Sequence, residues 1–157
     1  LISQIIILLT FLLFNFPNAK IFLGDSGAYL MGSLVALNTI ITNNLNPHIS
    51  SFFFCILLFY LFFEVFFSFI RKVVQKKSPV HPDSEHLHML NFKNITPLFG
   101  ANRGNYLNSL IINFVYFILI LPGLYFMKDP IFNRFWFFTL ILIYLLIYFR
   151  LYRLTKN

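Results

Sequence analysis

Five apolar stretches separated by polar segments dominate this chain, and they cover residues 1–16, 28–42, 49–70, 106–127 and 135–149. About 20 helical residues cross the hydrocarbon core of a bilayer. By that measure the third and fourth stretches are long enough to span it, the fifth is adequate and the second is short. The first is expected to be truncated. The pattern predicts an all-α, polytopic integral membrane protein with about five transmembrane helices.

The composition excludes a water-soluble domain, because 59% of the 157 residues are hydrophobic and only 11% are charged. The single cysteine, Cys55, lies in an apolar stretch and supports neither a disulfide framework nor a zinc–thiolate site. The formal net charge is +7. Because the basic residues flank apolar stretches, anionic lipid headgroups are the expected partner, and no nucleic acid is expected.

The chain contains no internal repeat and no low-complexity linker, so residues 1–157 are predicted to form a single membrane domain. The first residue, Leu1, opens directly into an apolar stretch without a basic segment before it. We therefore expect the chain to be the carboxy-terminal part of a larger domain.

The distribution of lysine and arginine predicts one orientation in the membrane. A cytoplasmic loop at residues 71–105 places every lysine and arginine except Lys128 and Arg134 on the cytoplasmic side. The same orientation puts the turn Gly24-Asp25-Ser26-Gly27 on that side. Asp25, Asp83, His86 and His88 are therefore expected at one membrane face, in a multi-pass protein of the cell inner (plasma) membrane.

Asp25 lies between an apolar segment and a helix expected to begin near Ala28. It is interpreted either as the N-cap of that helix or as a Mg²⁺ ligand, and the two roles are compatible. Gly24 and Gly27 on either side of it would allow a phosphate group to approach the backbone closely.

Residues 81–88 contain three of the four histidines and two of the five acids of the chain. Asp83 would cap a short helix with Glu85 in its first turn. In an extended segment, His86 and His88 would instead point the same way. A solvated polar loop is the third interpretation, and His81 fits either a loop role or a substrate contact.

Glu64 lies within an apolar stretch, where an ionisable side chain costs about 2.5–3.5 kcal/mol to insert. It is therefore expected to face protein or water, and on a helix it aligns with Ser68 and Arg71. Glu64 is interpreted either as a structural partner of Arg71 or as a support for the inner wall of a site. Arg71 is interpreted either as a residue that sets the membrane orientation and attracts lipid headgroups, or as one that contacts a substrate phosphate.

These motifs resemble, in order, the second half of the polyprenyl-phosphate N-acetylhexosamine-1-phosphate transferases of glycosyltransferase family 4. This family includes the lipid I synthase of peptidoglycan and enzymes that initiate O-antigen and teichoic acid. The resemblance covers roughly residues 17–90, and it rests on Lys20 to Gly27, Glu64, Phe66-Phe67-Ser68, Arg71-Lys72, Ser78-Pro79 and His81 to His88.

The resemblance implies transfer of a sugar 1-phosphate from a UDP-N-acetylhexosamine to a polyprenyl phosphate with Mg²⁺, or Mn²⁺, as cofactor. It implies that Asp25 is a metal ligand or catalytic carboxylate and that His86 and His88 are catalytic. Asp83, with Arg71 and His81, would contact the nucleotide-sugar. A phosphate attacking a phosphate meets high negative charge, which a metal and cationic side chains would neutralise. The sequence leaves a homodimer open.

Two departures from the family pattern bear on activity. Met89 stands where family members usually have another histidine, and the adjacent aspartate pair of the family has no counterpart among the five acids. We therefore predict that this chain alone is inactive. The alternatives are a metal-ion transporter or metal-binding membrane protein, in which residues 81–88 bind a transition metal, and a non-catalytic truncated remnant.

Overall fold

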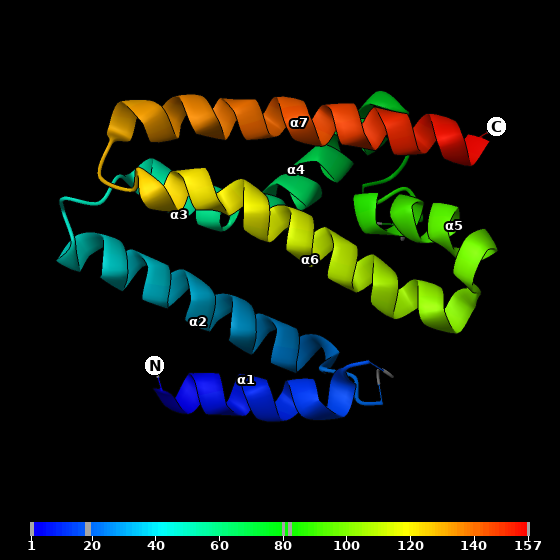
Figure 1. Ribbon diagram of the computed structural model, residues 1–157, viewed down its shortest axis with the longest axis horizontal. Helices are drawn as coiled ribbons and strands as arrows, with labels where there is room; N and C mark the ends of the chain where they lie inside the picture. Colours follow the sequence, from blue (N-terminus) through cyan, green and yellow to red (C-terminus); the bar gives the residue numbers. More distant parts are fainter. Residues whose placement is uncertain (1, 18–19, 80, 82, 157) are drawn as a thin grey trace. The chain divides into compact units, whose positions relative to one another are not determined.

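The computed structural model describes residues 2–17, 20–79, 81 and 83–156. The regular secondary structure of these residues is helical (Figure 1). The predicted all-α class is confirmed. In chain order the helices are α1 (Ile2–Asn15), α2 (Gly24–Leu45), α3 (Ser51–Leu57), α4 (Phe59–Val74), α5 (Leu87–Phe99), α6 (Ala101–Tyr125) and α7 (Pro130–Lys156).

Two described helices, α6 and α7, are long and apolar enough to cross a membrane, and α3 with α4 would make a third span if the bent pair counts as one. The predicted count of five is not confirmed. Helix α1 has 14 residues, a length of about 21 Å at 1.5 Å per residue, which is short of the hydrocarbon core. Helix α2 has 22 residues but carries several polar side chains along its length.

Helices α1 and α2 belong to the first of two compact units, Leu1–Leu45, and the second unit is Asn46–Asn157. Asn38 of α2 donates a hydrogen bond of 2.9 Å to the Gln4 side chain of α1, which joins the two helices. Helix α2 begins at Gly24, where φ is +68°, a left-handed conformation that favours glycine. The expected start near Ala28 is therefore wrong by one turn, since Gly24 allows the chain to enter the helix earlier.

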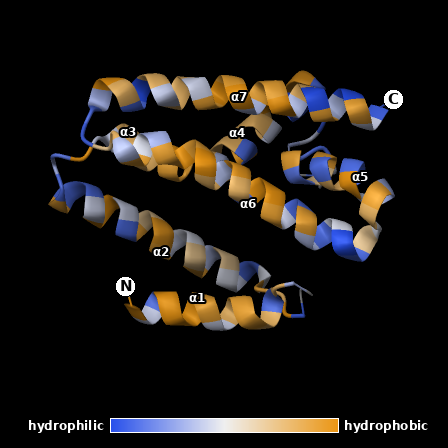
Figure 2. Ribbon diagram, in the orientation of Figure 1, coloured by the Kyte–Doolittle hydropathy of each residue, from blue (hydrophilic) through white to orange (hydrophobic). Residues whose placement is uncertain are grey.

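The second unit is built around an aromatic core to which α3, α4, α5 and α7 contribute. Phe63 of α4 meets the Tyr144 ring of α7 edge to face, with centroids 4.9 Å apart. Figure 2 shows apolar residues along much of α6 and α7, and hydrophilic residues around α5 and the adjoining end of α6. The buried residues of this core are Ile56, Phe59, Phe63, Leu87, Leu90, Leu140, Tyr144 and Tyr148.

The stretch at residues 49–70, predicted as one clear span, is two helices that meet at a bend of 73° at Leu58. The Tyr116 hydroxyl of α6 lies 3.0 Å from the Ile56 carbonyl and 2.7 Å from the Leu57 carbonyl, and it accepts a bond of 3.4 Å from the Tyr60 amide. One hydroxyl thus satisfies backbone groups that the break removes from the helix ladder.

The predicted loop at residues 71–105 is largely helical, because α4 runs to Val74, α5 fills Leu87–Phe99 and α6 begins at Ala101. The turn between α5 and α6 is made at Gly100, with φ of +76°. The two helices pack closely, since a Cβ on Gly104 would lie 3.3 Å from the Thr96 hydroxyl. The absence of a side chain at Gly104 thus allows the neighbouring helix to approach.

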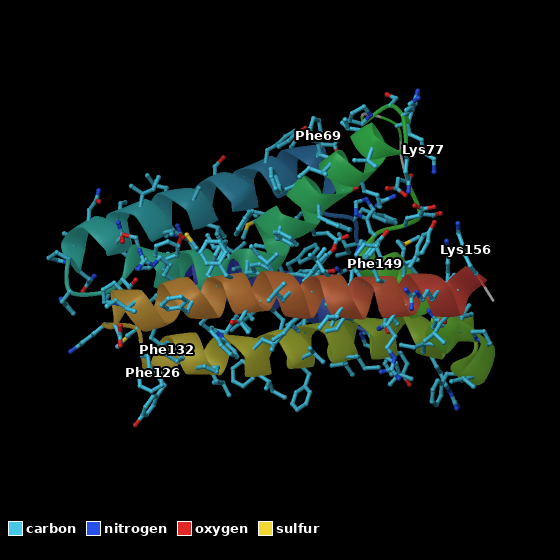
Figure 3. The ribbon with its side chains drawn as sticks, turned by 90° about the horizontal axis from the view of Figure 1, so that it is seen from above. Phe69, Lys77, Phe126, Phe132, Phe149 and Lys156 are labelled. Atoms are coloured by element: carbon cyan, nitrogen blue, oxygen red, sulfur yellow. The ribbon has the colours of Figure 1, made fainter. Side chains whose placement is uncertain are left out.

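Asn133 anchors the turn between α6 and α7 and is completely buried at 0% exposure. Its amide donates to the carbonyls of Phe126 (2.7 Å) and Asp129 (2.9 Å). The Asp129 carboxylate accepts from the backbone amides of Ile131 and Phe132, and so caps the start of α7. Figure 3 shows the labelled Phe126 and Phe132 next to each other at this turn.

Candidate functional site

Arg71, in the last turn of α4, binds both acids of the histidine-rich segment. Its guanidinium pairs with the Asp83 carboxylate and donates a bond of 2.7 Å to Glu85. It also reaches the Ser68 hydroxyl at 3.3 Å. A planar guanidinium with several donors suits such a fork, so Arg71 fixes the segment against the end of α4.

Asp83 is saturated by these contacts, because its other carboxylate oxygen accepts the Glu85 backbone amide at 2.7 Å. Burial alone would raise the Asp83 pKa. The hydrogen bond from Arg71, the Glu85 amide and the Arg71 charge outweigh burial, and the pKa lies below its ordinary value.

The segment forms neither a helix capped by Asp83 nor a free loop. Asp83 makes a turn to Glu85, and α5 starts only at Leu87, with His86 extended at its N-cap position (φ −67°, ψ 150°). The interpretation of Asp83 as a helix cap is therefore wrong. The physical reason is that the Asp83 side chain is already committed to Arg71 and to the amide two residues on.

Glu64, which lies in α4, caps the start of α5. It is 8% exposed. One carboxylate oxygen accepts the Leu87 amide at 2.9 Å and lies 3.0 Å from His86 Nδ1. The other accepts a bond of 2.6 Å from the Tyr144 hydroxyl. Glu64 therefore faces protein, as expected of an ionisable residue in an apolar stretch, and its partners are these three groups rather than Arg71.

His86 and His88 stack on each other, with ring centroids 5.6 Å apart and planes inclined by 17°. The two imidazoles are therefore neighbours, although the segment is not the extended one of the alternative, because only His86 is extended and His88 lies in the first turn of α5. Burial lowers the pKa of the His88 imidazole, the Glu64 charge opposes this and His86 adds to it, so the pKa lies below its ordinary value.

Lys72 of α4 binds the backbone at the start of the histidine-rich segment, residues 81–88. Its side chain is buried (7% exposed), and its ammonium donates to the carbonyls of Pro79 at 3.1 Å and His81 at 2.6 Å. The His81 backbone thus makes the contact, while its residue is exposed. An open pocket of about 410 Å³ lies here, lined by Lys72, Lys77, Ser78, His81, Asp83, Ser84 and Glu85. Figure 3 labels Lys77 at this end of the second unit.

Two groups of predicted residues come together in the second unit. Arg71 meets Asp83, and Glu64 meets His86, beside which His88 lies. Asp25, Gly24 and Gly27 belong to the first unit, so their expected convergence with the histidines stays a prediction. Asp25 itself is exposed in the first turn of α2, where the helix dipole favours a carboxylate. It is therefore one residue inside the helix rather than at its N-cap.

Tyr144 is a site residue that the sequence analysis did not single out, and Lys72 was noted there only as part of the Arg71-Lys72 motif. Tyrosine recurs every four residues in the last apolar stretch, at Tyr144, Tyr148 and Tyr152. This spacing aligns three hydroxyls on one helix face and was the available signal for Tyr144.

The described residues include no group of three or more histidine, cysteine, aspartate or glutamate side chains arranged to hold a metal ion. This geometry gives no support to the transition-metal alternative for His81, Asp83, His86 and His88. Among the described residues, the carboxylate oxygens of Glu64 and Asp83 already accept hydrogen bonds from other protein groups.

Comparisons with known proteins match part of this chain. The model of glycosyl transferase family 4 matches residues 1–43. An undecaprenyl-phosphate alpha-N-acetylglucosaminyl 1-phosphate transferase of Thermotoga maritima is 37% identical over 78 residues, which are 50% of this chain and 25% of that protein. The chain thus spans about a quarter of the length of this relative. No solved structure matches. The resemblance read from the motifs is confirmed for the part of the chain that these matches cover.

Proposed function

We propose, from the match of residues 1–43 to the model of glycosyl transferase family 4, that this chain is part of a sugar-1-phosphate transferase. The reaction proposed is transfer of N-acetylhexosamine 1-phosphate from a UDP-sugar to polyprenyl phosphate, in particular undecaprenyl phosphate, with release of UMP. The product would initiate a cell-envelope glycan. The substrate classes follow the name of the Thermotoga relative and the motif resemblance, and the chain alone is proposed to be inactive.

The observation that carries the proposal is the polar cluster where α4 ends and α5 begins. Two stacked imidazoles, His86 and His88, and the ion-paired Arg71 lie within one apolar helical unit. Phosphoryl transfer needs little covalent chemistry from the protein and much positioning and charge stabilisation. Donors fixed at the end of a membrane helix suit a reaction whose acceptor is a lipid.

The roles proposed for the residues follow their contacts. His86 and His88 would face the diphosphate, while Arg71 and Asp83, bound to each other, would shape the segment that meets the nucleotide. His81 would line the same pocket. The site is proposed to lie at the cytoplasmic face of the plasma membrane, a proposal that the distribution of basic residues supports.

Mg²⁺ is proposed as the cofactor, with Asp25 as one ligand. When bound, the metal would neutralise phosphate charge. The described acids of the second unit do not complete its coordination, because Glu64 and Asp83 are already engaged. The remaining carboxylates would come from outside this chain, which is the reason for the expected inactivity of the chain alone.

A chimera tests the proposal. The stretch of the Thermotoga transferase that corresponds to residues 1–90 is replaced by these residues, and transfer of radiolabelled sugar from UDP-N-acetylglucosamine to solvent-extractable undecaprenyl lipid is measured. We expect transfer by the chimera and none by its Asp25→Asn variant. A well-folded chimera without transfer contradicts the proposal, and transfer by the 157-residue chain alone contradicts its inactivity. Nucleotide-independent metal uptake by vesicles carrying the chain would favour the transporter alternative.

A further inference from the structure

Glu64 is a buried carboxylate whose two oxygens are filled by donors from two other helices and from the residue before α5. The Tyr144 hydroxyl donates at 2.6 Å, the Leu87 amide at 2.9 Å, and His86 Nδ1 lies at 3.0 Å. Both Glu64 and Tyr144 are at least nine-tenths buried, with 8% and 4% exposure. Such a set of short contacts leaves the carboxylate little freedom to turn.

The same contacts determine the hydrogen on the His86 ring. The Leu87 amide can only donate, so the Glu64 oxygen it reaches is an acceptor. That oxygen also faces His86 Nδ1, which must therefore carry a hydrogen to make a bond at 3.0 Å. In the neutral imidazole this leaves Nε2 without a hydrogen.

Nε2 is left available by the surroundings of the ring. Within the described residues it makes no hydrogen bond, and 28% of the His86 side chain is exposed. The His88 ring stacks on one face of the imidazole at 5.6 Å and limits its rotation. The ring is thus held from one nitrogen and one face, while its other nitrogen has no hydrogen-bond partner among the described residues.

We propose that Glu64 and Tyr144 are positioning residues that hold His86 as its Nδ1-protonated tautomer and leave Nε2 as the atom that acts on the substrate. Tyr144 acts through Glu64, and Glu64 acts through His86. The tautomer is inferred from the hydrogen-bond geometry alone. The catalytic role of Nε2 rests on the proposed function. A purely structural role of Glu64 would be limited to capping α5, and it would not require a particular tautomer at His86.

The direct test is nuclear magnetic resonance of the whole chain in lipid nanodiscs, with isotope-labelled histidine, at about pH 8, where an ordinary histidine is neutral. His86 is assigned from the spectrum of His86→Gln. We expect a hydrogen-bearing Nδ1 and a bare Nε2 at His86 in the unmodified chain. A hydrogen on Nε2 with a bare Nδ1, or an even mixture of the two forms, would contradict the proposal. This outcome can be read from the unmodified chain, without a substitution at Glu64 or Tyr144.

Two substitutions of Glu64 distinguish the effect of its hydrogen-bond acceptor on the His86 tautomer from the effect of its charge. Glu64→Gln keeps an oxygen able to accept from Leu87 and Nδ1, so the tautomer should persist. Glu64→Met removes the acceptor, so the tautomer should be lost. Retention of a fixed Nδ1-protonated form in a folded Glu64→Met chain would contradict the role of Glu64.

The catalytic part is tested in the active chimera extended to carry residues 1–157. Tyr144→Phe should lower kcat by about 10-fold to 100-fold, in the range for groups that orient an active side chain, with KM for the UDP-sugar little changed. Tyr148→Phe is the matched control, since Tyr148 lies one turn along α7, is buried and makes no side-chain hydrogen bond among the described residues. Equal kcat losses in both variants overturn the role of Tyr144. An inactive chimera with the expected His86 tautomer refutes the proposed function and leaves the tautomer intact.

Discussion

Tyr144 donates a hydrogen bond of 2.6 Å to Glu64, although 80 residues separate them in sequence. The bond ties α7 to α4, and through the other Glu64 oxygen it ties both to the start of α5 at Leu87. Three helices of the second unit therefore meet at one carboxylate. The residues beside this point, His86 and His88, are those that the motif resemblance assigns to catalysis.

Removal of this bond should destabilise the second unit. In Tyr144→Phe the ring packing is kept, but a buried acceptor loses a strong donor, for which we expect a cost of about 1–3 kcal/mol in the free energy of unfolding. Thermal or denaturant unfolding of the chain in detergent micelles measures it. Tyr148→Phe, whose hydroxyl has no partner among the described residues, should be neutral or slightly stabilising. A loss as large in Tyr148→Phe as in Tyr144→Phe contradicts the assigned hydrogen bond.

Much of this unit follows from patterns in the sequence. An ionisable residue in an apolar stretch must face protein, and Glu64 does. The rings of His86 and His88 stack, although the extended segment that would have brought them together is not formed, since His88 lies in α5. The partner of Glu64 was not predictable, because Arg71, seven residues on, is a plausible ion-pair partner on the same helix. Arg71 instead turns to two acids that sequence separation alone does not place near it.

Acid should weaken the second unit in two steps. The Asp83 and His88 pKa values both lie below their ordinary values, so the unfolded chain binds more protons than the folded chain as the pH falls. For His88 the loss begins below its ordinary value of about 6.5, and for Asp83 below its ordinary value of about 3.9. Stability from both groups is fully present above about pH 7.

The measurement is the unfolding midpoint between about pH 3 and pH 8. The His88→Gln variant should lose the upper step and retain the lower one. A midpoint that rises as the pH falls from 7 to 5 would show that the sign assigned to His88 is wrong.

Tyr116 should be required for the break between α3 and α4. In Tyr116→Phe the carbonyls of Ile56 and Leu57 lose their donor, and we expect a loss of about 1–3 kcal/mol in unfolding free energy. The comparison variant is Tyr125→Phe, because Tyr125 is 83% exposed at the end of the same helix. If Tyr116→Phe unfolds no more easily than Tyr125→Phe, the hydroxyl is not what satisfies the broken helix.

The bend between α3 and α4 could not be predicted from the sequence. Residues 49–70 contain no proline or glycine, which are the usual local causes of a kink. The group that contacts the break is a tyrosine hydroxyl of α6, 58 residues further along the chain from Leu58. The helices within the predicted loop at residues 71–105 were likewise not foreseen. Gly104 resembles a loop residue until the helix that packs on it is known.

Gly123 should not tolerate a side chain. A Cβ there would lie 3.1 Å from two atoms of Ile56 and 3.3 Å from the Asn133 amide oxygen, and both neighbours are completely buried. Gly123→Ala is expected to cost about 1–3 kcal/mol by overpacking, although alanine favours a helix. Gly32→Ala, in open space on α2, should be neutral or stabilising.

A second variant tests the contact itself. Ile56→Val removes one methyl group facing Gly123, so it should recover part of the stability lost in Gly123→Ala. Additive losses in the double variant would contradict the predicted contact between these two positions.

The central claim is that this chain supplies part of a sugar-1-phosphate transferase site, and UMP release by the chimera measures it most directly. We predict UMP release only when UDP-N-acetylglucosamine and undecaprenyl phosphate are both present, with loss of release in Asp25→Asn and His86→Gln. Absence of UMP release from a folded chimera, or release unaffected by both substitutions, would contradict the account.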